Sequence, residues 1–174
     1  KNIMRDYQRT KVYRWEREQP WASRKSYLTE QQVLDAVKKL DKNLPWVSFS
    51  KNGWSKINGQ KRKTKVIFSN GRGTSNANTK RIKLKRDWAM TYDVLLHEYA
   101  HQLSRDKHGP KFVSVYCCLL VAYHPDKPTF KELAKTLNEH NIDFDLFDRT
   151  WRILELSKRI KPFNNCLKNK EVIL

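Results

Sequence analysis

The sequence predicts an α+β fold in which one helix is followed by short strands and then by several more helices. Three observations lead to this prediction. An amphipathic helical pattern begins near position 29, strand-like segments lie between 46 and 85, and apolar segments with helical spacing follow from 91 onward. Strands and helices in separate runs are typical of α+β domains. With 174 residues and no internal repeat, the chain is long enough for one domain with a substantial core.

The first helix is predicted from its capping residues and its apolar spacing. Thr29 followed by Gln32 has the form of a capping box, in which each residue bonds the other's backbone N–H. Apolar residues then recur with helical spacing, at Val33, Leu34, Val37 and Leu40. Pro45 disfavours helical geometry at the residue before it, so the helix is expected to end near Asn43. Residues 1–28 are expected to form an N-terminal extension.

Three strands are predicted in the next part of the chain, at 46–50, 65–69 and 79–85. Asn-Gly pairs at 52–53, 58–59 and 70–71 separate them and are strong turn signals. Basic and apolar residues alternate along the last strand, in Arg81, Ile82, Lys83, Leu84 and Lys85. Such alternation is typical of a strand with one buried face, and its cationic outer face suits the edge of a sheet. We expect a small, twisted, mostly antiparallel sheet.

The second half of the chain returns to helix. Thr91 can cap a helix that runs to about 103, and Pro110 is well placed as the first residue of the next helix. That helix is dense in apolar residues and must end before Pro125. Further helices are predicted at 129–140 and 150–160. The chain is thus divided into a strand region at 42–86, a pair of helices at 91–124 and C-terminal helices at 125–174.

A histidine cluster in the middle of the chain carries the strongest chemical signal. His97-Glu98-Tyr99-Ala100-His101 has the spacing H-E-x-x-H and lies inside a predicted helix. Residues four apart share one helix face, so both imidazoles can bind one metal ion. His108 is the obvious third ligand, because catalytic zinc usually keeps three protein ligands and one open position. Glu98 points away from that face, and there it can act as a general base. The alternative is three hydrogen-bonded histidines with no metal.

The motif resembles the zinc site of SprT-like (Spartan-type) metallopeptidases, in which the third ligand also lies in an H-G-P-x-F-like segment. Here that segment is His108-Gly109-Pro110-Lys111-Phe112. The N-terminus also resembles the opening of small metallohydrolases of bacteria and phages, in Arg5-Asp6-x-Gln8-Arg9-x-x-Val12-Tyr13-x-x-Glu16.

The resemblance implies a zincin-like minimal metalloprotease domain with one catalytic Zn²⁺. It further implies a hydrolase that cleaves peptide bonds with a zinc-activated water and with Glu98 as the general base. The strand at residues 81–85 would then receive an extended protein or peptide substrate by strand addition.

The net charge of +18 is concentrated in one part of the chain. Residues 42–86, here called the basic segment, contain 13 Lys and Arg and no Asp or Glu. Cations interleaved with aromatic residues suit the binding of DNA or RNA, by phosphate neutralisation and base stacking. The candidate nucleic-acid-binding residues are Lys61, Arg62, Lys63, Lys65 and Arg72. A solvated lysine-rich sheet face explains the same pattern.

Other classes of protein are disfavoured. The N-terminal residues form no apolar signal segment, and no apolar run is long enough to span a bilayer. Cys117, Cys118 and Cys166 make no C-x-x-C pair and cannot form a complete disulfide framework. We therefore expect a cytoplasmic protein with no membrane partner. Two hypotheses remain open: a zinc metallopeptidase, and a nucleic-acid- or protein-binding module whose zinc site is structural or catalytically idle.

Overall fold

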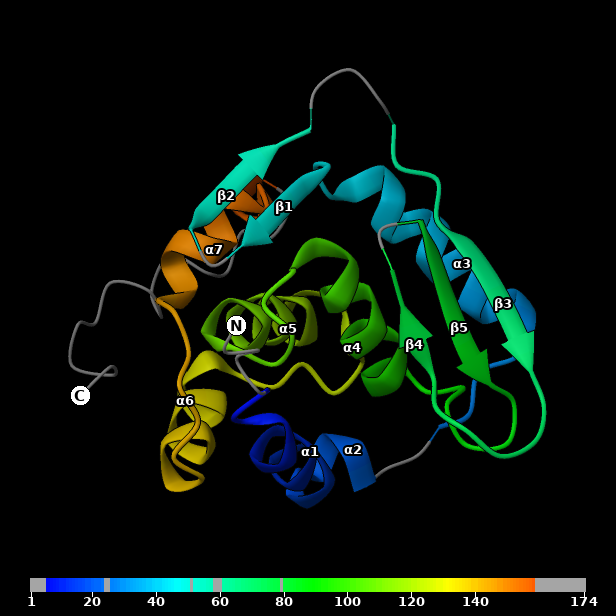
Figure 1. Cartoon of the computed structure of the whole chain (residues 1–174), viewed down its shortest axis with the longest axis horizontal. Helices are drawn as coiled ribbons and strands as arrows, with labels where there is room; N and C mark the ends of the chain where they lie inside the picture. Colours follow the sequence, from blue (N-terminus) through cyan, green and yellow to red (C-terminus); the bar gives the residue numbers. More distant parts are fainter. Residues whose placement is uncertain (1–5, 24–25, 51, 58–60, 79, 159–174) are drawn as a thin grey trace, which may run out of the picture.

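Two buried helices, α4 (Tyr92–Leu103) and α5 (Pro110–Tyr123), pack against each other at the centre of the structure (Figure 1). The structure is a computed structural model that describes residues 6–23, 26–50, 52–57, 61–78 and 80–158. Every side chain of α5 from 112 to 120 is buried, as expected for a helix surrounded by other elements. Both helices lie where the sequence predicts them, and the fold is mixed α and β as expected.

The described strands form two small sheets. In the first, β1 (Val47–Ser50) and β2 (Gly53–Lys56) make an antiparallel hairpin. The second has the strand order β3–β5–β4, with β3 (Lys65–Ser69), β4 (Asn76–Ala77) and β5 (Arg81–Lys85). All five residues of β5 pair in parallel with β3, whereas β4 pairs antiparallel with only two of them. The expected single, mostly antiparallel sheet is therefore replaced by a hairpin and a mixed sheet.

The expectation that residues 81–85 form a sheet edge is wrong, because β5 is the middle strand of its sheet. The edge next to it is β4, which contains only Asn76 and Ala77 and carries no recognisable strand pattern. Charged side chains on β5 do not mark an edge here. Lys85 is buried beneath the loop before β4, and Lys83 is only half-buried, so neither is a solvated edge lysine.

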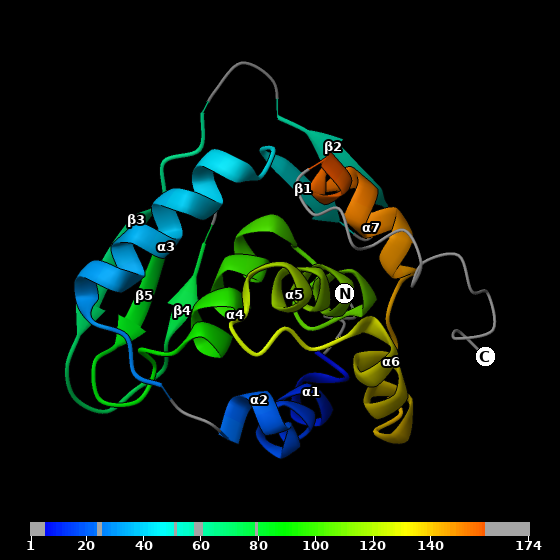
Figure 2. The same ribbon diagram turned by 180° about the vertical axis from the view of Figure 1, so that it is seen from behind.

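Helix α3 (Glu30–Asn43) lies along one face of this sheet, behind it in Figure 1 and in front of it in Figure 2. Both hydrogen bonds of its capping box are present: the backbone N–H of Thr29 donates to the Gln32 side chain, and the backbone N–H of Gln32 donates to the Thr29 hydroxyl. The helix ends with Leu44 as C-cap, one residue before Pro45. The sequence prediction for this helix is confirmed.

The N-terminal extension contains two helices that the sequence analysis does not predict, α1 (Arg9–Glu18) and α2 (Pro20–Ser23). The buried side of α1 is narrow, with Val12 and Trp15 three residues apart and both fully buried. Trp15 donates its indole N–H to Thr136 of α6 and meets Tyr116 of α5 edge to face. These contacts fix α1 against the central helices.

The C-terminal helices lie on the side of the central helices that faces away from the β3–β5–β4 sheet (Figure 1). They are α6 (Phe130–Glu139) and α7 (Phe147–Ile153), followed by the 3-10 turn η1 (Leu156–Lys158). The helix predicted at 129–140 is confirmed, whereas the one predicted at 150–160 begins three residues earlier and ends at 153. Positions 159–160, the turn at 58–59, Thr79 and Cys166 lie outside the described residues. None of the described helices has the length and apolar character needed to span a bilayer.

A buried polar network joins α3 to the basic segment and to α4. The Asp41 carboxylate accepts hydrogen bonds from the Tyr99 hydroxyl at 2.8 Å and from the backbone N–H of Thr64 at 2.7 Å. The Thr64 hydroxyl donates to the same carboxylate at 2.8 Å. Arg62 donates to the Tyr99 oxygen at 3.2 Å. Asp41 therefore holds the loop before β3 onto α4.

Replacing Asp41 is expected to destabilise the fold. Asp41→Ala leaves the Tyr99 hydroxyl and the Thr64 N–H without acceptors, which costs on the order of 2–4 kcal/mol. Chemical denaturation measures this as a drop in the free energy of unfolding. The matched control is Asp35→Ala on the same helix, where the carboxylate is exposed and, among the described residues, accepts only from Gln31. Equal losses in the two variants would contradict the role given to Asp41.

Candidate metal centre

Three histidines converge at the junction of α4 and α5. His97 and His101 lie one turn apart on α4, and His108 lies in the loop just before α5. One nitrogen of each ring lies within 4.8 Å of the corresponding nitrogens of the other two. The Nε2 atoms of His97 and His101 are 3.1 Å apart. These residues, here called the histidine triad, are the three ligands expected from the sequence, and the structure brings them together.

The loop geometry explains why Gly and Pro follow His108. Pro110 is the first residue of α5, where its missing N–H costs no hydrogen bond. The Asp106 carboxylate accepts from the backbone N–H of Lys111 and so occupies the N-terminus of α5. A Cβ at position 109 would collide with that carboxylate, so a larger residue there would displace Asp106 from the N-terminus of α5. The His108-Gly109-Pro110 sequence thus allows α5 to begin directly after a ligand.

Two carboxylates from the N-terminal region orient the triad. Glu16 of α1 lies 2.7 Å from Nδ1 of His97, and Asp6 lies 2.6 Å from Nδ1 of His108. A carboxylate only accepts hydrogen bonds, so Nδ1 is the protonated nitrogen of both rings and Nε2 carries the lone pair. Gln8 adds a 2.7 Å hydrogen bond to the carbonyl of His108. The segment just before α1 therefore fixes both the ring and the backbone of the third histidine.

Aromatic rings pack around the triad. Tyr13 stacks on His97, with centroids 5.6 Å apart, and meets His108 edge to face. Phe112, the last residue of the H-G-P-x-F segment, stacks on His101 at 4.2 Å. These contacts restrict the rotation of the imidazoles.

The electrostatic environment keeps two of the three imidazoles neutral. Burial lowers the pKa of His101, and the neighbouring His97 and His108 lower it further. Burial also lowers the pKa of His108, although Asp6 opposes the shift. Burial acts in the same direction on His97, but Glu16 outweighs it and the pKa of His97 is raised. Neutral imidazoles are the form that binds metal ions.

The histidine triad has the features of a set of metal ligands. His108 Nε2 is buried and has no hydrogen-bond partner, although buried polar atoms are normally paired. The Nε2 lone pairs of His97 and His108 are directed by the carboxylates on the other side of each ring. A cation among the three nitrogens would satisfy all of them at once. Three imidazoles suit zinc and other divalent transition metals. The triad could therefore hold such an ion.

Glu98 lies beside the triad and is not part of it. Its side chain is 7% exposed and lines a cleft together with His97. Burial raises the pKa of Glu98 to about 7, against the opposing effect of His97. Because α4 turns Glu98 away from the triad, its carboxylate is available for proton transfer in the cleft.

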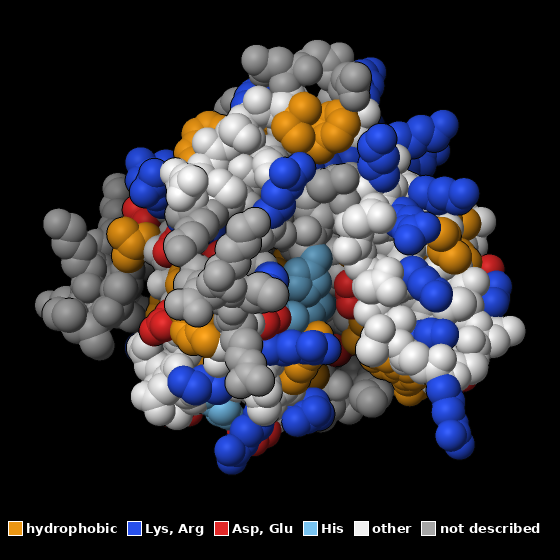
Figure 3. Space-filling view, in the orientation of Figure 1, with side chains coloured by type: hydrophobic (Ala, Val, Ile, Leu, Met, Phe, Trp, Pro, Cys, Tyr) orange, Lys and Arg blue, Asp and Glu red, His pale blue; other side chains and the backbone are white. Residues whose placement is uncertain are grey.

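The cleft next to the triad has a volume of about 560 Å³ and is here called the α1 cleft. One wall comes from α1 and α2, the other from residues before β4, and the floor from the first half of α4. Figure 3 shows the histidines in a hollow on this face, with acidic atoms beside them and Lys or Arg side chains below. The α1 cleft gives a ligand access to the triad and to Glu98.

Residues Arg81, Ile82, Lys83, Leu84 and Lys85, expected to bind substrate, do not line the α1 cleft. Lys85 is buried, and its ammonium group donates to the carbonyls of Asn70 and Arg72. Its backbone N–H donates to the Ser75 hydroxyl at 3.2 Å. Lys85 thus holds the loop that supplies Thr74 and Ser75 to the cleft. Strand β5 thus supports the loop that forms one wall of the cleft. Its own edges pair with β3 and β4, so neither edge is open to a peptide.

The candidate nucleic-acid-binding residues divide into exposed and buried ones. Lys61, Lys63, Lys65 and Arg72 are exposed. Arg62, in contrast, is 8% exposed, and its guanidinium lies 5.5 Å from the centre of the Tyr99 ring. The structure therefore places most of Arg62 in the interior, where it contacts α4, although the residue still lines the groove between α3 and residues 61–66.

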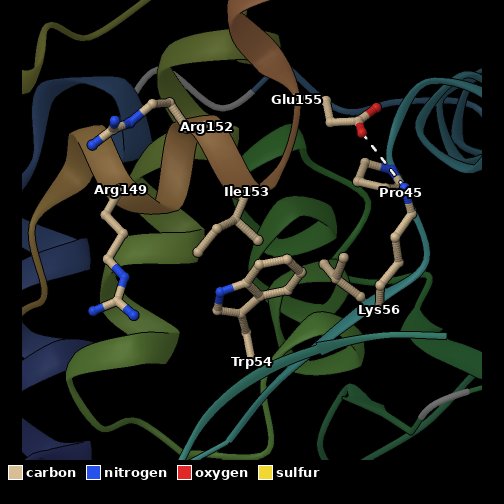
Figure 4. Close-up of a pocket in the computed structure, with 8 residues that line it drawn as sticks. Pro45, Trp54, Lys56, Arg149, Arg152, Ile153 and Glu155 are labelled. Carbon is tan, nitrogen blue, oxygen red and sulfur yellow. Dashed lines mark ion pairs between the residues drawn. The ribbon is translucent and has the colours of Figure 1, made fainter.

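Two further hollows lie apart from the triad. A groove of about 840 Å³ between α3 and residues 61–66, here called the lysine groove, is lined by Lys38, Lys42, Lys61 and Lys63 among others. A smaller hollow of about 350 Å³ lies between the β1–β2 hairpin and α7 (Figure 4). There Trp54 is 44% exposed and Arg149 is next to it, whereas Lys56 pairs with Glu155 at 3.7 Å.

Sequence reasoning missed the functional residues of the N-terminal region. Asp6, Gln8, Tyr13 and Glu16 all contact the triad, yet they belong to a segment expected to be an extension. The signal was the short pattern of these residues, which spans less than three helical turns. No local rule links that pattern to a histidine about 100 residues later.

Removing an orienting carboxylate is expected to weaken metal binding. Asp6→Asn or Glu16→Gln leaves the histidine triad intact but replaces the charged acceptor of the Nδ1–H with a neutral amide, and loss of such a carboxylate typically costs 10–100-fold in affinity. Zn²⁺ titration against a chelating dye measures the loss. The control is Glu18→Gln on the same helix, whose carboxylate contacts Arg14 and His140 instead. Unchanged Zn²⁺ affinity in both variants would contradict the orienting role.

Comparison of the chain with known proteins adds no identification. No family model, curated protein or solved structure matches it. The candidate centre therefore depends on its own geometry: three convergent imidazoles, two orienting carboxylates and a glutamate facing an adjoining cleft.

Proposed function

We propose that the chain is a zinc-dependent metallopeptidase of zincin-like fold, similar to SprT-like enzymes. The observation that carries the proposal is the position of Glu98, which is buried at the α1 cleft next to the histidine triad. A purely structural metal site has no need of a general base or of access from a cleft. Both features are expected of a hydrolase.

Zinc is the ion that suits the triad best for hydrolysis. Three imidazole ligands leave one position open for water or substrate, as in catalytic zinc sites. When bound, zinc acts as a Lewis acid that polarises a carbonyl group and makes water a stronger nucleophile at neutral pH. His97, His101 and His108 would hold it through the nitrogens that face one another.

Glu98 would move the proton in the reaction. A carboxylate that lines the cleft can accept the proton of the attacking water and return it to the leaving amine. Burial favours this exchange because few competing water molecules reach the side chain. The role assigned to Glu98 depends on a carboxylate that can take up a proton, which a side chain of the same size without that group cannot supply.

The substrate would be an extended protein or peptide segment. Strand β4 pairs with β5 on one side only, so its other edge is free within the described sheet. Ser75, directly before β4, lines the α1 cleft. A peptide could add to this edge by backbone hydrogen bonds and pass Glu98. The edge at β4 takes the place of the strand expected from the sequence.

A second candidate function is nucleic-acid binding at the lysine groove, with an idle or structural metal site. Four lysines line this groove, and the acidic residue among the lining residues, Asp41, is occupied by Tyr99 and Thr64. Phosphate groups bind such a surface through charge and release of counterions. The peptidase remains the preferred proposal because this groove leaves the triad and Glu98 without a role.

The general-base assignment predicts a separation of metal binding from activity. Glu98→Gln should keep Zn²⁺ affinity within about threefold and lower peptide cleavage at least 100-fold, since general-base catalysis contributes roughly 10²–10⁴-fold. Mass spectrometry of cleaved peptides and metal analysis give the two readouts. Chelation should abolish wild-type activity, and added Zn²⁺ should restore it.

The matched control is Glu139→Gln, an exposed glutamate on α6, which should cleave like the wild type. Full activity of Glu98→Gln would refute the mechanism. A wild-type protein that binds Zn²⁺ tightly but cleaves no peptide from a broad library would favour the binding module.

Nucleic-acid binding predicts a salt-dependent affinity that depends on the lysine groove. Reversing Lys61 and Lys63 to Glu should weaken binding to single-stranded DNA or RNA and reduce the salt slope by about one per lost phosphate contact. Fluorescence anisotropy at several salt concentrations measures both. The control is the double reversal of Lys131 and Lys135, two exposed lysines on α6. Identical behaviour of the two double variants would exclude the groove.

A further inference from the structure

We propose that Arg9 and Arg17 of α1 bind a carboxylate of the substrate, so that the peptidase selects peptides with an acidic group near the scissile bond. The inference rests on the proposed peptidase function and adds the chemical class of its substrate. It follows from the position of the two arginines and from the charges around them.

Both arginines lie on the helix face that forms a wall of the α1 cleft. Residues at i, i+4 and i+8 share one face of a helix, which places Arg9, Tyr13 and Arg17 in a row. All three line the cleft. Both arginines are exposed. Their guanidinium groups are thus accessible to a ligand that reaches the triad through this cleft.

Neither arginine pairs with an acidic side chain among the described residues. Arg9 lies over the ring of Tyr13, with its guanidinium carbon 5.6 Å from the ring centre. Arg14, which lies on the same helix away from the cleft, differs because it pairs with Glu18 at 3.0 Å. The cleft therefore contains two guanidinium groups that have no carboxylate of their own.

The acidic residues of the cleft do not neutralise these arginines. Glu16 is engaged by His97 at 2.7 Å. Asp93 is half-buried and, among the described residues, forms no ion pair with either arginine. Glu98 has the proposed role of general base. A divalent ion at the triad would add further positive charge, so a substrate carboxylate is the group that this cleft attracts.

The spacing of the arginines sets the distance over which they can act. Eight residues of α-helix rise about 12 Å. An extended peptide covers the same distance in about three to four residues. Tyr13, in the middle of the row, stacks on His97 and meets His108, so each arginine lies about 6 Å along α1 from the ring that contacts the triad. The two arginines could therefore contact carboxylates within about three residues of the scissile bond, and their planar groups suit bidentate binding.

Peptide binding tests the inference without turnover. Zn²⁺-loaded Glu98→Gln protein is titrated into fluorescent peptides that are acetylated and amidated and that differ only by Asp, Asn or Lys at one position. We expect the best Asp peptide to bind about tenfold more tightly than its Asn counterpart, as for a charge-assisted contact. Adding Arg17→Glu or Arg9→Gln should remove most of this difference, and Arg17→Glu should favour Lys.

The matched control is Arg14→Glu, which changes the same charge on the same helix outside the cleft and should keep the preference for Asp. A further pair of peptides has a free or an amidated C-terminus. Tighter binding of the free form would show that the arginines bind the terminal carboxylate. Tighter binding of the internal Asp peptides would show that they bind the Asp side chain.

The outcomes separate this inference from the proposed function. Equal binding of Asp, Asn and Lys peptides at every position overturns the inference, even if the wild type cleaves peptides. A preference for Asp that Arg14→Glu removes as fully as Arg17→Glu also overturns it. A preference for Asp that depends on Arg17, in a wild type that cleaves none of these peptides, supports carboxylate binding and refutes the peptidase.

Discussion

The hydrogen bonds between two carboxylates and two imidazoles are the constraint on which the site depends. Glu16 and Asp6 hold the Nδ1 atoms of His97 and His108, and so direct both Nε2 atoms to the same point. His101 reaches that point from the next turn of α4. Without these acceptors, the tautomer of the two buried rings would no longer be fixed. The N-terminal region is therefore part of the site, because it is packed across the two helices that carry the ligands.

The same packing creates the cleft. One side of α1 is buried through Val12 and Trp15, while the adjoining side carries Tyr13 and Glu16 to the triad. Because a helix displays residues three and four apart together, the face that orients the histidine triad also presents arginines to the cleft. One short helix thus orients the histidine triad and, on the proposed function, would also recognise the substrate.

The basic segment serves structural as well as surface roles. Lys85 and Arg62 are buried, and their charged groups bond backbone carbonyls and the Tyr99 hydroxyl, respectively. They hold the loop at 70–75 and the loop before β3 in place. The exposed cations are the ones that can contact a partner directly. A count of charges along the sequence therefore overstates the number that face a partner, because burial is decided by packing.

The sequence by itself determined the histidine triad, Glu98 and the helices that carry them. Those signals are local: a spacing of four residues, a capping box, and proline at a helix start each act within about one turn. Tertiary structure alone decided that Asp6 and Glu16 orient the ligands, that β5 is a central strand, and that Arg62 is buried. Each of these joins residues far apart in the chain. Such contacts arise from the packing of complete elements, which no short window of sequence encodes.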